Sequence, residues 1–236
     1  MKSGVCAMVR RSISAARALA AAALIAATLV HAGEPTYSDA EKRLFMDDHL
    51  RGLPASGKTL EYTFAKRGTL EGSVDDTARV VVGPAAAGAG RAVKVEYLSD
   101  QRKLELPDIP SASGNPIVLF FLEREVREMH RLTGGSVNYY RKRIRLALAE
   151  GADVDTVQVE VGSRKVSATR IRIAPYRDDP ARVRYEKFAQ TTYVFMLSDD
   201  VPGKVVEMRS ELLGSKDGAG GAEPVLAETL RYARER

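Results

Sequence analysis

The sequence predicts an α+β protein, mainly β, in which a curved antiparallel sheet of about nine strands forms a half-barrel around one central helix, with a second helix at the N-terminal end. Three observations predict this class. Apolar and polar residues alternate in many short segments, which is typical of half-buried strands. Residues 116–133 repeat apolar residues at helical spacing instead. Short turn sequences join most of the alternating segments, and such turns connect antiparallel neighbours.

The first helix is predicted from a capping box, Ser38-Asp-Ala-Glu41, in which each end residue satisfies a backbone N–H of the other. We expect this helix to run to about Arg51, because Gly52 ends it and Pro54 prevents its continuation. Its expected buried side chains are Leu44, Phe45 and Leu50.

Strands follow, because the apolar period changes from 3.6 to 2. The predicted strands before the central helix are 60–64, 74–82 and 91–99, with a flexible Gly/Ala loop over 83–90 and a short edge piece at 103–107.

The central helix is predicted over Pro116–Thr133, with Asn115 as its N-cap and Gly134-Gly135 closing it. Phe120 and Phe121 widen its apolar face, and this breadth indicates that the helix lies against a sheet. The apolar stripe consists of Leu119, Leu122, Val126 and Met129.

Strand patterns dominate the rest of the chain. Gly162-Ser163 suits a hairpin turn, and Asp179-Pro180 suits the start of a short helix that carries Tyr185 and Phe188. The last segment fits either a closing strand or a helix, and the strand is favoured. The predicted strands are 137–149, 154–161, 165–174, 192–197, 205–212 and 225–232, with a Gly-rich loop over 214–221 before the last.

Residues 1–32 have the three-part layout of a secretory signal peptide: basic residues, the apolar run Leu19–Val30, and small residues at −3 and −1 of a cut before Gly33. The apolar run is shorter than the roughly 20 residues that a spanning helix needs. We expect a periplasmic protein with no transmembrane segment after cleavage and a single domain over 33–236. Arg10-Arg11 leaves twin-arginine export open beside the ordinary route.

Removing the leader changes the composition. Residues 33–236 hold 32 basic and 31 acidic residues, so the strong basic excess expected of a nucleic-acid-binding protein is missing. The only cysteine, Cys6, lies in the leader, so disulfides, thiolate ligands and a cysteine nucleophile are excluded from the mature chain.

Several motifs that resemble functional sites are better explained by local structure. Gly52–Thr59 matches the phosphate-loop pattern, but a helix precedes it and a strand follows, the reverse of what phosphate binding needs. His49 and His130 are expected on solvated helix surfaces, so no metal site is predicted. Three pairs of aspartates fall in or beside predicted turns, where Asp is favoured, and no catalytic set stands out: Asp75-Asp76, Asp178-Asp179 and Asp199-Asp200. We therefore predict a non-enzyme without cofactors.

The most distinctive segment is Tyr139–Arg145. On a strand, its arginines share one face, where guanidinium groups could hold phosphates or carboxylates. The alternative is a solvent-exposed face paired with acids such as Glu160. The candidate anion-binding residues are Arg141, Arg143 and Arg145.

The cleaved leader, the N-terminal helix, the antiparallel strands, the internal amphipathic helix and the ending Thr192–Gly203 together resemble the LolA/LolB-like superfamily. The blocks Gly114–Glu125 and Ile173–Pro180 resemble those of uncharacterised proteobacterial proteins. The resemblance implies an unclosed barrel with helices in its mouth and, because no lipobox cysteine is present, a soluble carrier. It also implies an apolar groove on the concave face, with these candidate lining residues: Tyr62, Phe64, Tyr97, Ile144, Leu146, Tyr193 and Phe195.

Two functions follow as hypotheses. The first is a non-enzymatic periplasmic binding or carrier protein for a lipid, lipoprotein or other amphiphile, whose chain would be held by burial of its CH₂ groups. The second is a structural or interaction protein of the cell envelope, in which the central helix fills the groove and an exposed face meets an envelope protein.

Overall fold

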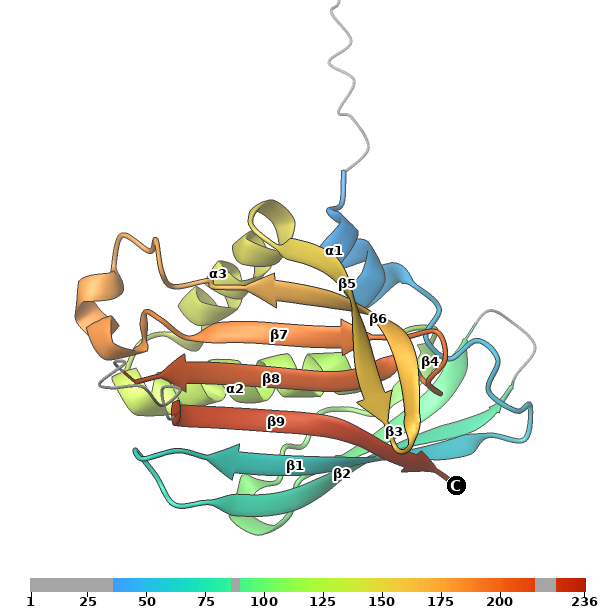
Figure 1. Ribbon diagram of the computed structural model, residues 1–236. Helices are drawn as coiled ribbons and strands as arrows, with labels where there is room; N and C mark the ends of the chain where they lie inside the picture. Colours follow the sequence, from blue (N-terminus) through green and yellow to red (C-terminus); the bar gives the residue numbers. More distant parts are fainter. Residues whose placement is uncertain (1–35, 86–89, 215–223) are drawn as a thin grey trace, which may run out of the picture. The chain divides into compact units, whose positions relative to one another are not determined.

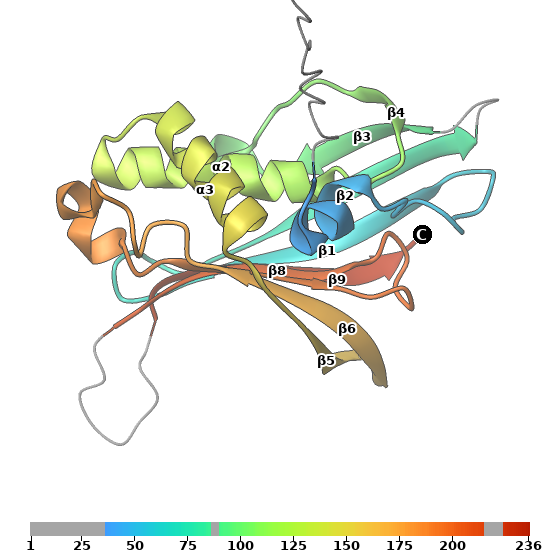
Figure 2. The ribbon, with the colours of Figure 1, turned by 90° about the horizontal axis from the view of Figure 1, so that it is seen from above.

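The structure, a computed structural model, describes residues 36–85, 90–214 and 224–236. The predicted leader and the tips of the two glycine-rich loops lie outside these ranges. Residues Tyr37–Arg236 form one compact unit. The predicted fold class is confirmed, because a nine-stranded, wholly antiparallel open sheet carries helices on one face (Figures 1 and 2).

The strand order is β4-β3-β2-β1-β9-β8-β7-β6-β5. The last strand, β9, therefore pairs with both β1 and β8 and joins the meander β1–β4 to the meander β5–β8. Figure 2 shows that the helices lie on one face of the sheet and that the β5–β6 hairpin bends away from them. The strands are β1 (Lys58–Arg67), β2 (Val74–Ala85), β3 (Arg91–Tyr97), β4 (Ile109–Ala112), β5 (Asp153–Val161), β6 (Arg164–Ile173), β7 (Thr192–Leu197), β8 (Val205–Leu213) and β9 (Pro224–Glu235).

The main helices are α2 (Ile117–Thr133) and α3 (Val137–Glu150). Before them come α1 (Asp39–Glu41) and the π-helical turn η1 (Lys42–Met46), and two short 3₁₀ helices complete the set, η2 (Asp100–Arg102) and η3 (Arg182–Phe188). The predicted short helix after Asp179-Pro180 is η3, and the predicted closing strand is β9.

The core lies between α2 and the sheet and is rich in aromatic rings. Phe120 packs on Tyr97 with ring centroids 5.8 Å apart, and Phe121 packs edge-on against Phe195 at 6.0 Å. All four side chains are buried. Adjacent residues of one helix therefore contact β3 on one side and β7 on the other, which fixes α2 across the sheet.

Ion pairs add a second kind of contact between α2 and the sheet. Arg124 donates to both carboxylate oxygens of Glu228 on β9, at 2.7 and 2.6 Å. Lys66 on β1 lies 2.9 Å from the Glu128 carboxylate of α2. Glu228 is 1 % exposed, so its charge is compensated inside the protein rather than by water. We call Lys66, Arg124, Glu128 and Glu228 the ionic seam.

The first helix is shorter than predicted. The Ser38–Glu41 capping box is present, but the helix tightens into the π-turn and ends at Met46 instead of Arg51. Leu44 and Leu50 are buried as predicted, whereas the prediction for Phe45 is wrong, because its side chain is 38 % exposed.

The strand predicted over 137–149 is wrong, because these residues form α3. Tyr140, Ile144 and Leu148 are buried at a spacing of four, which is a helical period. The alternation of charged and apolar residues in the same segment had favoured a strand. Gly134, at a φ of +71°, ends α2 and lets the chain reverse into a new helix. The sheet still has nine strands because β4 is a strand that the prediction lacked; the expected edge piece at 103–107 is only a single bridge between Tyr97 and Leu104.

Candidate functional site

The sheet-derived residues predicted to line a groove lie in the packed interior. Five of them are at most 1 % exposed and pack beneath the helices: Tyr62, Phe64, Tyr97, Tyr193 and Phe195. In this structure they form core between the sheet and α2 and do not line an open groove. Ile144 and Leu146 lie on α3, not on a strand, and they border two different hollows.

The three candidate anion-binding arginines do not share a strand face, because their segment is helical. Arg141 donates to Glu123 of α2 at 2.8 Å, and Arg143 lies 3.0 Å from the buried carboxylate of Asp179. Arg145 is exposed and borders an apolar cavity. The predicted row of three guanidinium groups is therefore replaced by one interhelical pair, one buried pair and one side chain at a cavity rim.

An apolar hollow among the described residues lies between α1–η1, α2 and α3, and we call it the helical cavity. Its volume is about 380 Å³, within the range of small-molecule sites. Its apolar lining consists of Phe45, Leu106, Leu119, Leu122, Val126, Ile144 and Leu148, and its charged rim of Glu41, Glu123, Arg141 and Arg145.

The cavity exists because α2 is apolar on two sides. Phe120 and Phe121 face the sheet, while Leu119, Leu122 and Val126 face the cavity. Leu119 is 49 % exposed, so its predicted place in a buried stripe is wrong. Leu119 and Phe45 leave apolar surface open to solvent beside the apolar lining of the cavity. The sequence signal that could have found them is the apolar breadth of α2, which exceeds what one sheet can cover.

The carboxylates at the rim are held by neighbouring groups. Glu41 completes the capping box by accepting from the Ser38 N–H at 3.0 Å. Glu123 accepts from Arg127 at 3.0 Å and from Arg141 at 2.8 Å. Although desolvation works against it, these hydrogen bonds lower the pKa of Glu123, so it stays a carboxylate.

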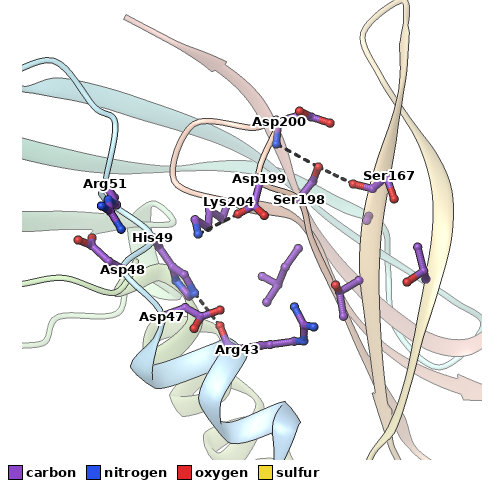
Figure 3. Close-up of a pocket in the computed structure, with 14 residues that line it drawn as sticks. Arg43, Asp47, Asp48, His49, Arg51, Ser167, Ser198, Asp199, Asp200 and Lys204 are labelled. Carbon is purple, nitrogen blue, oxygen red and sulfur yellow. Dashed lines mark hydrogen bonds and ion pairs between the residues drawn. The ribbon is translucent and has the colours of Figure 1, made fainter.

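A second hollow, of about 460 Å³, is polar (Figure 3). It lies between the segment 43–51, the strands β5 and β6, and the turn from β7 to β8. Lys204 pairs with Asp199 at 2.8 Å inside it, and Ser198 donates to the Ser167 carbonyl at 2.6 Å. Charges of both signs line this hollow, so it offers no single preference for an anion or a cation.

His49 on the wall of the polar hollow is buried, so its predicted solvated position is wrong. Its Nδ1 accepts from the Asn115 N–H at 3.1 Å, so Nε2 carries the proton that is donated to the Arg43 carbonyl at 2.6 Å. Burial lowers the pKa of His49, helped by the charge of Lys204 and opposed by the Arg43 hydrogen bond. The ring is a neutral structural bridge.

The other motifs stay structural. His130 is exposed, as predicted. Gly52–Thr59 leads into β1, and no helix follows the glycines. Asp76 lies within β2 instead of a turn and accepts from Ser99 and Arg102, while Asp179 accepts from Tyr139 and the Ala181 N–H. No cluster of three metal-binding side chains occurs in the ranges that the structure covers. Within the same ranges, every helix is too short or too polar to cross a bilayer.

Comparisons with known proteins concern the fold. No protein-family model and no curated protein matches the sequence. The structure is similar to the lipoprotein LppX of Mycobacterium tuberculosis, with 14 % identity, a TM-score of 0.32, and 83 % of this chain and 94 % of that chain covered. It is also similar to a LolA superfamily protein of Nitrosomonas europaea, with 10 % identity, a TM-score of 0.21, and coverage of 83 % and 92 %. The second belongs to the superfamily that the sequence layout resembles.

Proposed function

We propose that this protein is a non-enzymatic binding or carrier protein for an amphiphile, exported to the periplasm, and that the acyl chain of its ligand lies in the helical cavity. The observation that carries the proposal is the cavity itself: seven apolar side chains surround about 380 Å³, and two of them, Leu119 and Phe45, are 49 % and 38 % exposed. Burying acyl CH₂ groups there contributes about 0.8 kcal/mol each.

The ionic seam supports this location over the groove first predicted. A ligand between α2 and the sheet would have to separate Arg124 from Glu228 and Lys66 from Glu128. Breaking a buried ion pair typically costs 3–5 kcal/mol, roughly what four to six CH₂ groups would return. The helical cavity takes a chain without disturbing any of these pairs.

The first experiment is native mass spectrometry of the protein purified from a periplasmic extract, followed by titration of the delipidated protein with n-alkyl amphiphiles of 6 to 14 carbons. We expect affinity to rise about fourfold per CH₂ and then to level off when the cavity is full. An affinity that does not depend on chain length would contradict the proposal and favour an envelope interaction protein with a filled core.

A variant pair tests the location. Leu119→Asn removes apolar surface that the ligand would cover, and because half of this side chain is already buried, we expect about 1 kcal/mol, or roughly fivefold weaker binding. Val183→Asn is the matched control, since Val183 is 78 % exposed on η3 and does not line the cavity. Equal effects of the two substitutions would place the ligand elsewhere.

A further inference from the structure

The charged groups at the rim of the helical cavity differ in how they are satisfied. Two of them are carboxylates and two are guanidinium groups, so a simple count gives no net charge. What a ligand meets, however, depends on which of these charges already has a partner within the protein.

Three of the four charged rim groups already make a hydrogen bond within the protein. The Glu41 carboxylate closes the capping box with Ser38. Glu123 and Arg141 neutralise one another at 2.8 Å, and Arg141 also donates to the Asn138 side chain at 2.7 Å. Groups held in such pairs have little left to offer a ligand, because binding would first have to break an existing charge-assisted hydrogen bond.

Arg145 is the exception. Its exposed guanidinium borders the cavity and has neither a hydrogen bond nor an ion pair with any residue in the described ranges. It lies on α3 one residue after Ile144 and three before Leu148, both of which line the apolar wall. The rim therefore presents five unused donors beside an apolar space.

We propose that the ligand of the helical cavity is an amphiphile with one acyl chain and an anionic headgroup, and that Arg145 binds this headgroup. The proposal rests on the proposed function, since it specifies the polar end of the same ligand. A guanidinium forms two parallel hydrogen bonds with a carboxylate or a phosphate, so either headgroup fits. A quaternary ammonium does not, because Arg145 would repel it.

The test compares three probes by calorimetry at low salt: decyl phosphate, decyltrimethylammonium and inorganic phosphate. We expect decyl phosphate to bind at least tenfold more tightly than decyltrimethylammonium, and inorganic phosphate not to bind measurably. Raising the salt to 0.5 M should reduce the preference, because exposed charges are screened. Decanoate in a fourth titration distinguishes a carboxylate from a phosphate headgroup.

Two variants assign the preference to one residue. Arg145→Glu should remove or reverse the preference, and Arg145→Gln should reduce it about tenfold. Lys142→Glu makes the same change in charge at an exposed position of α3 that does not line the cavity, and it should keep the preference within twofold.

The outcomes separate the two proposals. Equal binding of both decyl probes overturns the anionic headgroup, and an unchanged preference in both Arg145 variants overturns the role of Arg145. Both results leave the acyl cavity in place. Binding of neither decyl probe overturns both proposals. Binding of inorganic phosphate as tightly as decyl phosphate also overturns the inference, because the anion would then be held independently of a chain.

Discussion

Asn115 offers the sharpest test of how this fold is held together. Its side chain is buried where α2 begins and bonds to three separate parts of the chain. The amide nitrogen donates to the Tyr62 hydroxyl at 2.9 Å and to the Gly203 carbonyl at 3.0 Å. Its oxygen accepts from the Ile117 N–H at 3.2 Å, in the first turn of α2. Asn115→Ala removes all three bonds at once.

The expected loss of stability depends on whether the partners of the Asn115 amide find other hydrogen bonds. Each hydrogen bond contributes about 1 kcal/mol net, and a buried partner left without a bond costs about 1–3 kcal/mol. Tyr62 is 1 % exposed, so water cannot replace the amide there. Relaxation recovers part of the cost, and we expect Asn115→Ala to lower the free energy of unfolding by about 4 kcal/mol. The turn from β7 to β8 cannot move freely into the space left by the amide, because Gly203 already packs against Leu60.

Equilibrium urea unfolding at pH 7.5 measures the effect. With an m-value of about 2 kcal/mol/M, a loss of about 4 kcal/mol lowers the midpoint by about 2 M. The matched control is Asn138→Ala, because Asn138 is exposed and bonds only to Arg141, and its effect should stay within about 0.5 kcal/mol. A loss below 1 kcal/mol for Asn115→Ala would refute the reasoning that this amide joins α2, β1 and the β7–β8 turn.

Two further predictions concern pH. Because the pKa of His49 is lowered in the folded state, the folded protein binds fewer protons than the unfolded chain, so the free energy of unfolding should fall as the pH drops below about 6.5. This fall should be at most about 1.4 kcal/mol per pH unit. Urea midpoints of His49→Gln should lack this slope, whereas those of His130→Gln should keep it. Burial and the charge of Glu228 raise the pKa of Glu125 well above its usual value, so this acid weakens the fold as the pH rises above about 4.5. Glu125→Gln should therefore gain stability relative to the parent between pH 5 and pH 9, and an equal difference at both pH values would show that Glu125 is not the group responsible.

The strands were predictable because their pattern is local. In β1, Leu60, Tyr62 and Phe64 are buried and alternate with the more exposed Glu61 and Thr63. The same rule failed over 137–149, where arginines at every second residue imitated a strand while the buried residues 140, 144 and 148 kept a helical spacing. Whether such a segment is assigned as helix or strand depends on which of its apolar residues are buried. The sequence of the segment does not show which residues an element distant in the chain will bury.

The site depended on contacts that no local pattern contains. His49 looked solvated because its partner, Asn115, is 66 residues away. Leu119 and Phe45 looked like core because they are apolar, yet their exposure depends on how closely α3 approaches α2. Since α3 was predicted as a strand, the cavity between the helices could not be predicted. Of the residues selected from the sequence, Ile144, Arg141 and Arg145 border the helical cavity, although they were selected for a strand geometry that does not occur.

The two faces of α2 support the proposal that a ligand lies between the helices. The face toward the sheet combines aromatic packing with the ionic seam, and lifting it would expose Phe120 and Phe121 and separate Arg124 from Glu228. The face toward α3 is apolar, with the Glu123–Arg141 pair at its edge. Binding free energy is largest where filling a space breaks the fewest existing contacts. In this fold that space is the helical cavity, and the sheet serves as the rigid support on which α2 holds one wall of the site in place.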